Sequence, residues 1–166
     1  MATFITCDLL DDNEDKVIDV IPPIIGTQRF VNFGGKTTFG GQVVTVKCFE
    51  DNSRVKELLA TSGEGKVLVV DGGESTRCAL LGDMIAKSAL DNGWEGVIIA
   101  GCVRDVDDIA KMNIGVMALA SIPKKSVRKG VGETQLPITI GGVKIRPDDW
   151  IYADNNGIIV SSEKLI

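Results

Sequence analysis

The chain of 166 residues contains no histidine. This absence excludes the Ser-His-Asp and Cys-His systems that activate serine and cysteine nucleophiles, and the histidine-containing ligand sets typical of zinc and iron. Any acid–base chemistry must then use carboxylates, lysine, tyrosine or water on a metal. Carboxylates and waters suit a hard cation, so a bound metal would be Mg²⁺, Mn²⁺ or Ca²⁺.

Other features are also missing. No apolar run approaches the length of a membrane span, and the N-terminal residues do not form a charged-then-apolar signal peptide, so the expected location is the cytoplasm. The net charge is −5 and no basic block is longer than Lys124-Lys125, which argues against direct binding of nucleic acid. The four cysteines form no C-x-x-C pair and are expected to be reduced, mostly buried thiols.

What is present indicates one domain over residues 1–166. The hydrophobic fraction is 44% and there are 19 glycines, as in a turn-rich globular chain. Apolar periodicity predicts helices at residues 6–15, 52–60, 83–91 and 105–112. Strands are predicted at residues 40–49, 66–70, 96–100, 115–120, 136–140, 143–145, 149–153 and 157–160. The alternation in the middle of the chain predicts an α/β fold with parallel βαβ units, its β layers covered by helices.

Glycine and charge follow the predicted strand ends, where ligands bind in open α/β sheets. Gly82-Asp83 opens a predicted helix, so the N–H groups of Met84 and Ile85 would point outward unpaired and would suit a carboxylate or phosphate. Asp83 itself has the wrong charge to hold that anion, but it could hold water or the outer shell of a metal. A lone acid at this position is more often a helix cap.

A second group of charged residues follows the next predicted strand. Asp105 and Asp108 are three residues apart, which on a helix places their Cβ atoms roughly 5–6 Å apart on one face. Two such carboxylates can share a divalent ion and its waters. Arg104 offers a rigid fork for a substrate carboxylate or an enolate oxygen. The simpler interpretation is an exposed acidic turn with an Arg–Asp ion pair.

Five segments carry a wider similarity. They are FGGQVVTVKCFEDN (residues 39–52), GKVLVVDGGESTRCALLGD (65–83), NGWEGVIIAGCVRDVDDI (92–109), IGVMALASIP (114–123) and WIYADNNGIIV (150–160). Together they resemble the RraA-like family, which includes regulators of ribonuclease activity and the class II 4-hydroxy-4-methyl-2-oxoglutarate aldolases. The resemblance covers nearly the whole chain and needs no gap between the segments.

The resemblance implies an α-β-β-α sandwich of the swivelling β/β/α type. It also implies a homotrimer or a hexamer with active sites between subunits. The aldolase branch carries an acid, then an Arg-Asp pair after twenty residues, then an acid after two more. Asp83, Arg104-Asp105 and Asp108 complete this pattern. The ribonuclease regulator best known from bacteria lacks the intact Arg-Asp pair, so the resemblance favours a catalytically competent chain.

By this resemblance the protein is expected to be a metal-dependent lyase. It would cleave 4-hydroxy-4-methyl-2-oxoglutarate, or a related 4-hydroxy-2-oxo acid, to pyruvate, and it would also decarboxylate oxaloacetate. Asp105 would bind the divalent cation, Mg²⁺ before Mn²⁺. Asp108 would act on a water molecule of that ion.

The remaining roles concern the substrate itself. Arg104 would pair with the enolate oxygen, and Asp83 would position a water that carries protons. The backbone after Gly82, with the N–H groups of Met84 and Ile85, would hold the substrate's 1-carboxylate. Gly82 would allow close approach because it has no side chain.

Three other functions stay open. A class I aldolase would need a Schiff-base lysine, for which Lys47 is the candidate, although a snorkelling strand-edge lysine explains it better. A binding module would be an acidic trimer that inhibits a ribonuclease by contacting its basic surface, without chemistry. A methyltransferase would need a cofactor loop, for which Asp71-Gly72-Gly73 is weak evidence without a G-x-G-x-x-G pattern.

Overall fold

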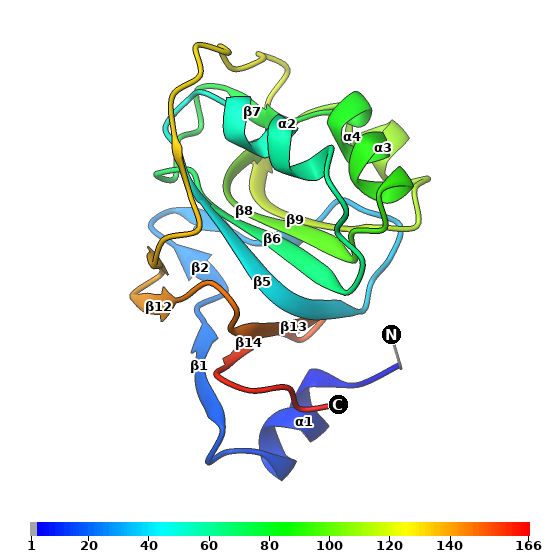
Figure 1. The fold of residues 1–166 in the computed structure, drawn as a ribbon, viewed down its shortest axis with the longest axis vertical. Coiled ribbons are helices and arrows are strands. Elements are labelled where there is room, and N and C mark those ends of the chain that lie inside the picture. Colours follow the sequence, from blue (N-terminus) through cyan, green and yellow to red (C-terminus); the bar gives the residue numbers. More distant parts are fainter. Residues whose placement is uncertain (1–2) are drawn as a thin grey trace.

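The chain forms two β layers enclosed by helices (Figure 1). The computed structural model describes residues 3–166. Its helices are α1 (Thr6–Asp12), α2 (Ser53–Leu59), α3 (Asp83–Asp91) and α4 (Val106–Ile109). Its strands are β1 (Val17–Ile21), β2 (Ile24–Ile25), β3 (Gln28–Arg29), β4 (Val31–Asn32), β5 (Phe39–Lys47), β6 (Lys66–Asp71), β7 (Ala79–Leu81), β8 (Gly96–Val103), β9 (Gly115–Ser121), β10 (Glu133–Thr134), β11 (Ile138–Ile140), β12 (Val143–Ile145), β13 (Trp150–Asp154) and β14 (Gly157–Ser161).

The first β layer is the parallel sheet β5-β6-β8-β9, as the βαβ alternation predicts. Every residue of β8 is buried, which is typical of a parallel strand covered on both faces. Two glycines let this layer close around one aromatic ring. A Cβ on Gly96 would come within 2.3 Å of the Phe39 ring, and one on Gly115 within 2.1 Å.

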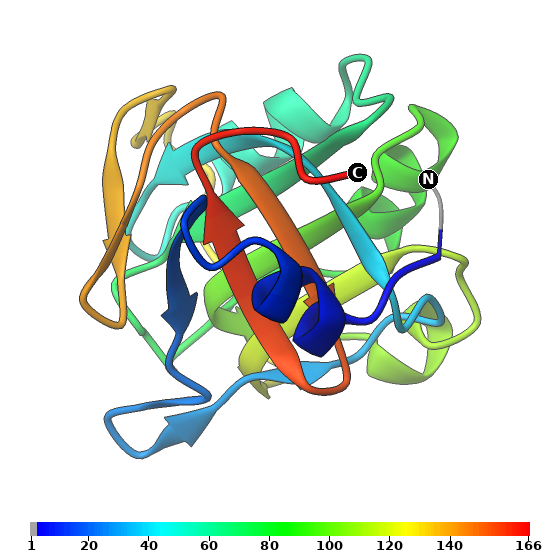
Figure 2. The ribbon, with the colours of Figure 1, turned by 90° about the horizontal axis from the view of Figure 1, so that it is seen from below.

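The second β layer continues from β5, which pairs in parallel with β6 and antiparallel with β13. Strands β14 and β1 follow β13 in antiparallel order. Figure 2 shows α1 lying across the outer face of β13 and β14. The order of strands along the main sheet is therefore β1-β14-β13-β5-β6-β8-β9-β4.

Three apolar clusters separate the four layers. Between the β layers, Val69 of β6 packs in the same cluster as Ile151 of β13. Because side chains alternate along a strand, the next residue of β6, Val70, faces the cluster beneath α2 and α3. Under α1, the Phe4 and Tyr152 rings meet edge to face with their centroids 5.4 Å apart. These layers confirm the predicted α-β-β-α sandwich.

Several predicted bounds change on folding. Helix α3 occupies residues 83–91 as predicted, and Asn92-Gly93 follows it. The helix expected at residues 105–112 shortens to α4: it begins after Asp105, whose backbone is left-handed (φ 56°), and it ends at Ile109. The helix expected at residues 6–15 ends at Asp12. Strand β7, which the sequence did not predict, pairs in parallel with the end of β8.

The cysteines are free thiols, as expected. Cys48, Cys78 and Cys102 are buried and Cys7 is exposed. Burial raises the pKa of the Cys102 thiol, which keeps it protonated and unreactive at neutral pH. Within residues 3–166, none of the helices combines the length and apolar character needed to span a bilayer.

Candidate active site

A cleft of about 810 Å³ opens beyond the carboxyl ends of β7 and β8, at the start of α3. This is the place where strand-end chemistry was expected. Four parts of the chain form its walls: Asn52 before α2, β7 with the start of α3, the residues after β8, and a distant segment at residues 124–129. The lining residues are Asn52, Ala79, Leu81, Gly82, Asp83, Met84, Ile85, Arg104, Asp105, Lys124, Lys125, Ser126, Val127, Arg128 and Lys129.

Asp105 points towards α3 and does not cap its own helix. Its left-handed backbone is a conformation that aspartate tolerates better than most residues. Its side chain makes no cap hydrogen bond to α4, and its Oδ2 accepts the backbone N–H of Asp83 at 3.0 Å. The carboxylate therefore sits at the N-terminal end of α3, where the helix dipole stabilises negative charge.

Gly82 leaves the space that this contact needs. A Cβ at position 82 would lie 2.6 Å from Oδ2 of Asp105 and 3.3 Å from Nε of Arg104. The backbone at Gly82 is extended, so the constraint is the space and not the φ angle. The sequence predicts that Gly82 allows a close approach because it has no side chain. In the structure the group that approaches Gly82 is the carboxylate of Asp105.

The first turn of α3 differs from expectation at one position. The prediction that the N–H of Met84 is unpaired is wrong, because Oδ1 of Asp83 accepts it at 2.8 Å. Asp83 closes back on its own helix, as acids in a first turn often do. Met84 is 82% exposed, whereas Ile85 is buried in the apolar cluster beneath α2 and α3.

Arg104 lies at the end of β8, beside Asp105. Its backbone N–H donates to the Leu81 carbonyl at 2.9 Å, which joins the end of β8 to the end of β7. Its Nε lies 3.8 Å from Oδ2 of Asp105, and 37% of its side chain is exposed. The Arg–Asp ion pair of the simpler interpretation is therefore present, and it lies within the cleft.

Asp108 lies outside the cleft-lining residues. It is exposed, and its Oδ1 lies 4.0 Å from Nζ of Lys111 on the outer side of α4. Across residues 3–166 there is no group of three or more His, Cys, Asp or Glu side chains arranged to hold a metal. A cation in this cleft would thus depend on one or two carboxylates, with water and substrate oxygens completing its shell.

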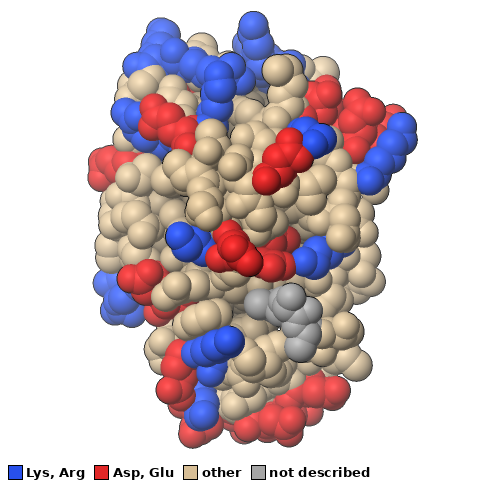
Figure 3. Space-filling model, turned by 45° about the vertical axis from the view of Figure 1, so that its right-hand side comes forward, with Lys and Arg blue, Asp and Glu red and all other residues tan. Residues whose placement is uncertain are grey.

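The basic arm, which we define as Lys124–Lys129, is the part of the site that the sequence did not reveal. It brings Lys124, Lys125, Arg128 and Lys129 to the cleft. With Arg104, the lining holds five positive charges against the two of Asp83 and Asp105. Lys and Arg side chains crowd the top of Figure 3, the end at which this segment lies in Figure 1. An acidic protein thus presents a locally positive cleft, which favours an anionic ligand.

The residues behind two of the alternatives lie elsewhere. Lys47 is exposed at the end of β5, in register with Glu133 of β10, and is not part of the cleft wall. Gly72 follows β6, where a Cβ would meet Leu80 and the Ala100 carbonyl at 2.7 and 2.8 Å. Packing therefore accounts for Gly72 without a cofactor.

Residues 6–160 match a family described as RraA-like, Aldolase/RraA. The chain belongs to the RraA-like family. A relative from Acinetobacter baylyi is 60% identical over 98% of this chain and 96% of its own length. Another from Alcanivorax borkumensis is 57% identical over 99% of both chains. Both carry the provisional name 4-hydroxy-4-methyl-2-oxoglutarate aldolase.

Solved structures of RraA-like proteins share the fold under other names. One from Geobacillus kaustophilus, titled an S-adenosylmethionine:2-dimethylmenaquinone methyltransferase, has a TM-score of 0.91 and 42% identity over 98% of this chain and 97% of that one. An RNA-processing inhibitor, RraA, from a species of Thermus has a TM-score of 0.90 and 39% identity over 98% and 94% of the two chains. One fold thus carries three different names, so the function must be argued from the site.

Proposed function

We propose that the protein is a divalent-metal-dependent class II pyruvate aldolase. It cleaves 4-hydroxy-4-methyl-2-oxoglutarate or a related 4-hydroxy-2-oxo acid to pyruvate, and it also decarboxylates oxaloacetate. The observation that carries this proposal is the cleft in which Asp83, Arg104 and Asp105 meet beside the basic arm. The aldolase name borne by relatives at 53–60% identity supports the same assignment.

Both reactions pass through the enolate of pyruvate, and the charge on its oxygen makes the barrier. We assign Arg104 to that oxygen, because its guanidinium stays charged and its backbone is fixed at the end of β8. The first turn of α3, at Gly82 to Ile85, takes the 1-carboxylate of the substrate. The basic arm faces the other anionic end.

Asp83 has a role that its self-capping contact suggests. An arriving carboxylate would replace Oδ1 of Asp83 as acceptor of the Met84 N–H. The Asp83 side chain would then be free to orient a water, which takes up the proton of the substrate's 4-hydroxyl as the carbon–carbon bond breaks and delivers a proton to the enolate carbon. A carboxylate and water suit a chain that contains no histidine.

The carboxylates present fit a hard cation such as Mg²⁺ or Mn²⁺. Oδ2 of Asp105 is occupied by the Asp83 N–H, and none of the hydrogen bonds among residues 3–166 reaches its Oδ1. Mg²⁺ commonly binds through one or two carboxylates and keeps several waters. Asp105 is the ligand we propose, whereas Asp108, expected to act on a water of the ion, lies outside the cleft lining and takes no part in this proposal. When bound, such an ion supplies Lewis-acid stabilisation of the enolate charge.

The second candidate is a regulator that binds a ribonuclease without chemistry. It is favoured by the likeness to the Thermus RNA-processing inhibitor, with a TM-score of 0.90. With either function, we propose that the chain assembles as a homotrimer or a hexamer. Exposed apolar residues such as Met84 and Val127 flank the cleft, and a neighbouring subunit would cover them. Activity separates the two candidates.

The test is pyruvate release from oxaloacetate and from 4-hydroxy-4-methyl-2-oxoglutarate, with Mg²⁺ and with EDTA. We expect release that requires the metal, and a loss of at least about 100-fold in kcat for Asp105→Ala, which removes the proposed ligand. Asp107→Ala is the matched control, because Asp107 is an exposed acid two positions away that does not line the cleft. Its kcat should stay close to that of the unmodified chain.

Two results would contradict the aldolase. One is full activity in Asp105→Ala. The other is no pyruvate above the blank that contains metal alone, from protein shown to be folded. The second result would favour the ribonuclease regulator, and Arg104 and Asp105 would then be an ion pair at a helix terminus.

A further inference from the structure

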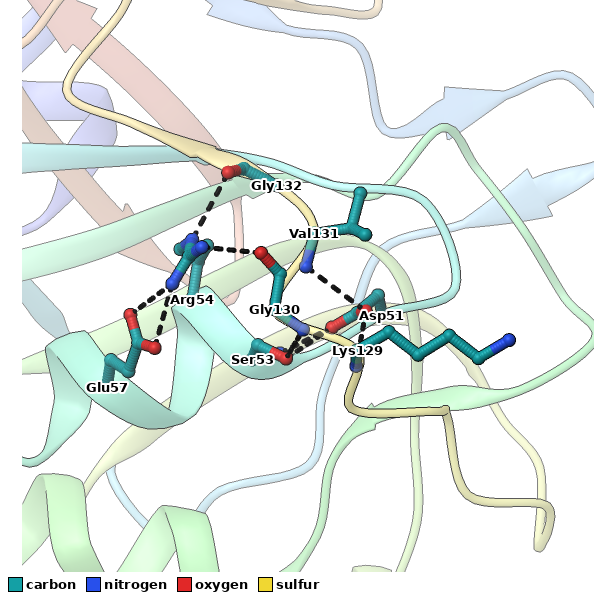
Figure 4. Close-up of polar contacts among 8 residues, drawn as sticks. All are labelled: Asp51, Ser53, Arg54, Glu57, Lys129, Gly130, Val131 and Gly132. Atoms are coloured by element: carbon teal, nitrogen blue, oxygen red, sulfur yellow. Dashed lines mark hydrogen bonds and ion pairs between the residues drawn. The ribbon is translucent and has the colours of Figure 1, made fainter.

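A buried carboxylate, Asp51, lies behind the cleft wall. It stands between β5 and α2, and its residue is only 3% exposed. Its Oδ1 accepts the Ser53 backbone N–H at 2.9 Å and the Ser53 hydroxyl at 2.6 Å. Its Oδ2 accepts the backbone N–H groups of Lys129 at 2.8 Å and Val131 at 3.3 Å. One side chain thus joins the start of α2 to a segment almost eighty positions away (Figure 4).

Neighbouring contacts hold the same segment on its other side. The Gly130 N–H donates to the Ser53 hydroxyl at 2.9 Å. The Arg54 guanidinium donates to the carbonyls of Gly130 and Gly132, while Glu57 holds its outer edge (Figure 4). Backbone N–H and carbonyl groups of residues 129–132 therefore form hydrogen bonds with side chains at the start of α2. They do so without belonging to a strand.

These contacts exceed what a helix cap requires. Asp51 precedes Asn52, the N-cap residue of α2, and only its two bonds to Ser53 serve the start of that helix. Burial by itself would raise the pKa of Asp51, yet the hydrogen bonds outweigh it and lower the pKa from 3.8 to about 2. The carboxylate is therefore ionised, and the N–H groups of Lys129 and Val131 supply part of the compensation that a buried charge needs.

The basic arm ends at Lys129, where the contacts with Asp51 begin, and it has further anchors of its own. At its start, the Lys124 carbonyl accepts the Ala79 N–H at 2.7 Å, which fixes the arm to β7. Near its end, Nε of Arg128 donates to Oδ1 of Asn52 at 3.2 Å, so the residue after Asp51 holds a cation of the cleft directly. Between these two anchors the Ser126 N–H donates to the Ala79 carbonyl at 3.2 Å and the Val127 N–H donates to the Glu50 carbonyl at 3.3 Å, so the arm is held along its length and Asp51 holds its Lys129 end.

We propose that Asp51 is a positioning residue that holds the basic arm across the cleft and thereby sets the affinity for the anionic substrate. It touches no cleft ligand itself and acts through the backbone of Lys129 and Val131. The inference rests on the proposed function for its kinetic part. The anchoring of the arm can be measured independently of any activity.

The variant that tests the proposal is Asp51→Asn. The amide keeps the shape of the side chain and one acceptor oxygen for Ser53. Its NH₂ group faces the N–H groups of Lys129 and Val131, so two donors lose their acceptor. We expect KM for oxaloacetate to rise at least about tenfold, the equivalent of one or two lost charge-assisted hydrogen bonds, with kcat within about threefold of the unmodified chain.

Limited trypsin digestion of the native protein provides the second readout. The arm offers four cleavage points, after Lys124, Lys125, Arg128 and Lys129. Cleavage there requires the segment to leave its anchors, so Asp51→Asn should increase the rate of cutting within residues 124–129 at least about tenfold. Cutting elsewhere in the chain should not change.

Two controls separate positioning from general loss of stability. Asp154→Asn alters another buried carboxylate, 8% exposed, that accepts the N–H and hydroxyl of Thr6 far from the cleft. Glu57→Gln alters the exposed outer edge of the Arg54 contacts and leaves the Asp51 bonds intact. Neither should change KM or the cutting of the arm.

The outcomes are distinct. A raised KM together with faster cutting of the arm, in Asp51→Asn alone, supports the proposal. An unchanged KM with faster cutting overturns it, because the arm would move without affecting binding, and so does an equal effect in Asp154→Asn. If the unmodified protein releases no pyruvate, the proposed function fails. In that case, an unchanged rate of trypsin cleavage in Asp51→Asn would contradict the inference that Asp51 anchors the arm. Faster cleavage confined to the arm would support that inference.

Discussion

Asp105 contacts two different groups through a single oxygen. Its Oδ2 accepts the Asp83 N–H and lies 3.8 Å from Nε of Arg104, so one atom ties the start of α3 to the end of β8. The other oxygen stays available to a ligand. Asp105 can therefore hold the wall of the cleft with one oxygen and bind a ligand in the cleft with the other.

Replacement of Gly82 tests this arrangement. In Gly82→Ala the new Cβ would come 2.6 Å from Oδ2 of Asp105, so the carboxylate must turn away from α3. We expect kcat for pyruvate release to fall at least about tenfold, because a shift of about 1 Å in a reacting group can cost more than that. The measurement is steady-state kinetics, with the melting temperature followed in parallel.

The matched control is Lys87→Ala, on the exposed side of the same helix, which loses only its pairing with Asp91. It should keep the kcat of the unmodified chain. A Gly82→Ala protein that is folded and fully active would show that the Asp105 carboxylate does not need its present position.

At the scale of elements, α3 and the basic arm were predictable to very different degrees. Helix α3 follows from local signals: Gly82-Asp83 before it, an apolar stripe along it and Asn92-Gly93 after it. The grouping of Asp83, Arg104 and Asp105 follows from strand ends and the family resemblance. The arm carries no such signal, because only long-range contacts bring it to the cleft, those of Lys124 and Ser126 with Ala79 and that of Lys129 with Asp51.

The charge of the arm leads to a prediction at this scale. Replacing both Lys124 and Lys125 by alanine removes two of the five positive charges of the lining. We expect KM for oxaloacetate to rise several-fold and to depend less on ionic strength, since screened attraction by exposed charges contributes to its capture. Kinetics at low and high salt measure both effects.

Lys56→Ala is the comparison for this pair, because Lys56 is an exposed lysine of α2 outside the cleft. It should leave KM and its salt dependence unchanged. If the double variant binds oxaloacetate as well as the unmodified chain at every salt concentration, the arm does not attract the substrate.

At the scale of the whole molecule, two buried carboxylates hold opposite ends of the structure. Asp51 anchors the arm above the central sheet, and Asp154 holds Thr6 beneath the second β layer. Burial would raise both pKa values, but hydrogen bonds outweigh it and lower them. For Asp51 the folded value is about 2, against 3.8 for an ordinary aspartate.

The sign of the pH effect follows from these shifts. A carboxyl whose pKa is lower in the folded state stabilises the fold above its unfolded pKa, and this stabilisation is lost as pH falls through the folded value. The free energy of unfolding should therefore decline between about pH 4 and pH 2. Urea denaturation of the unmodified chain and of the Asp51→Asn, Asp154→Asn double variant measures it. The variant should be less stable at neutral pH and change less over this interval, and parallel curves would contradict the assignment.

The sequence predicts the α/β class of the layered fold, but it does not predict which strands pair with one another. Alternating strands and helices predict the parallel sheet, and the family resemblance implies the sandwich. Nothing local indicates that β5 pairs with β13, more than a hundred positions later, or that β1 lies beside β14. Such pairings are set by which buried faces fit together, and that information is spread over both β layers.

The pairing of β1 with β14 also has a consequence for synthesis on the ribosome. Residues 17–21 emerge early, yet their partner strand, residues 157–161, is among the later parts translated. Until then Ile18, Val20 and Ile21 have no strand beside them, and the nascent chain carries an unpaired apolar edge through most of its elongation. Long-range pairing of this kind slows folding and favours association between chains. Synthesis is therefore a stage at which this apolar edge is open to association with other chains.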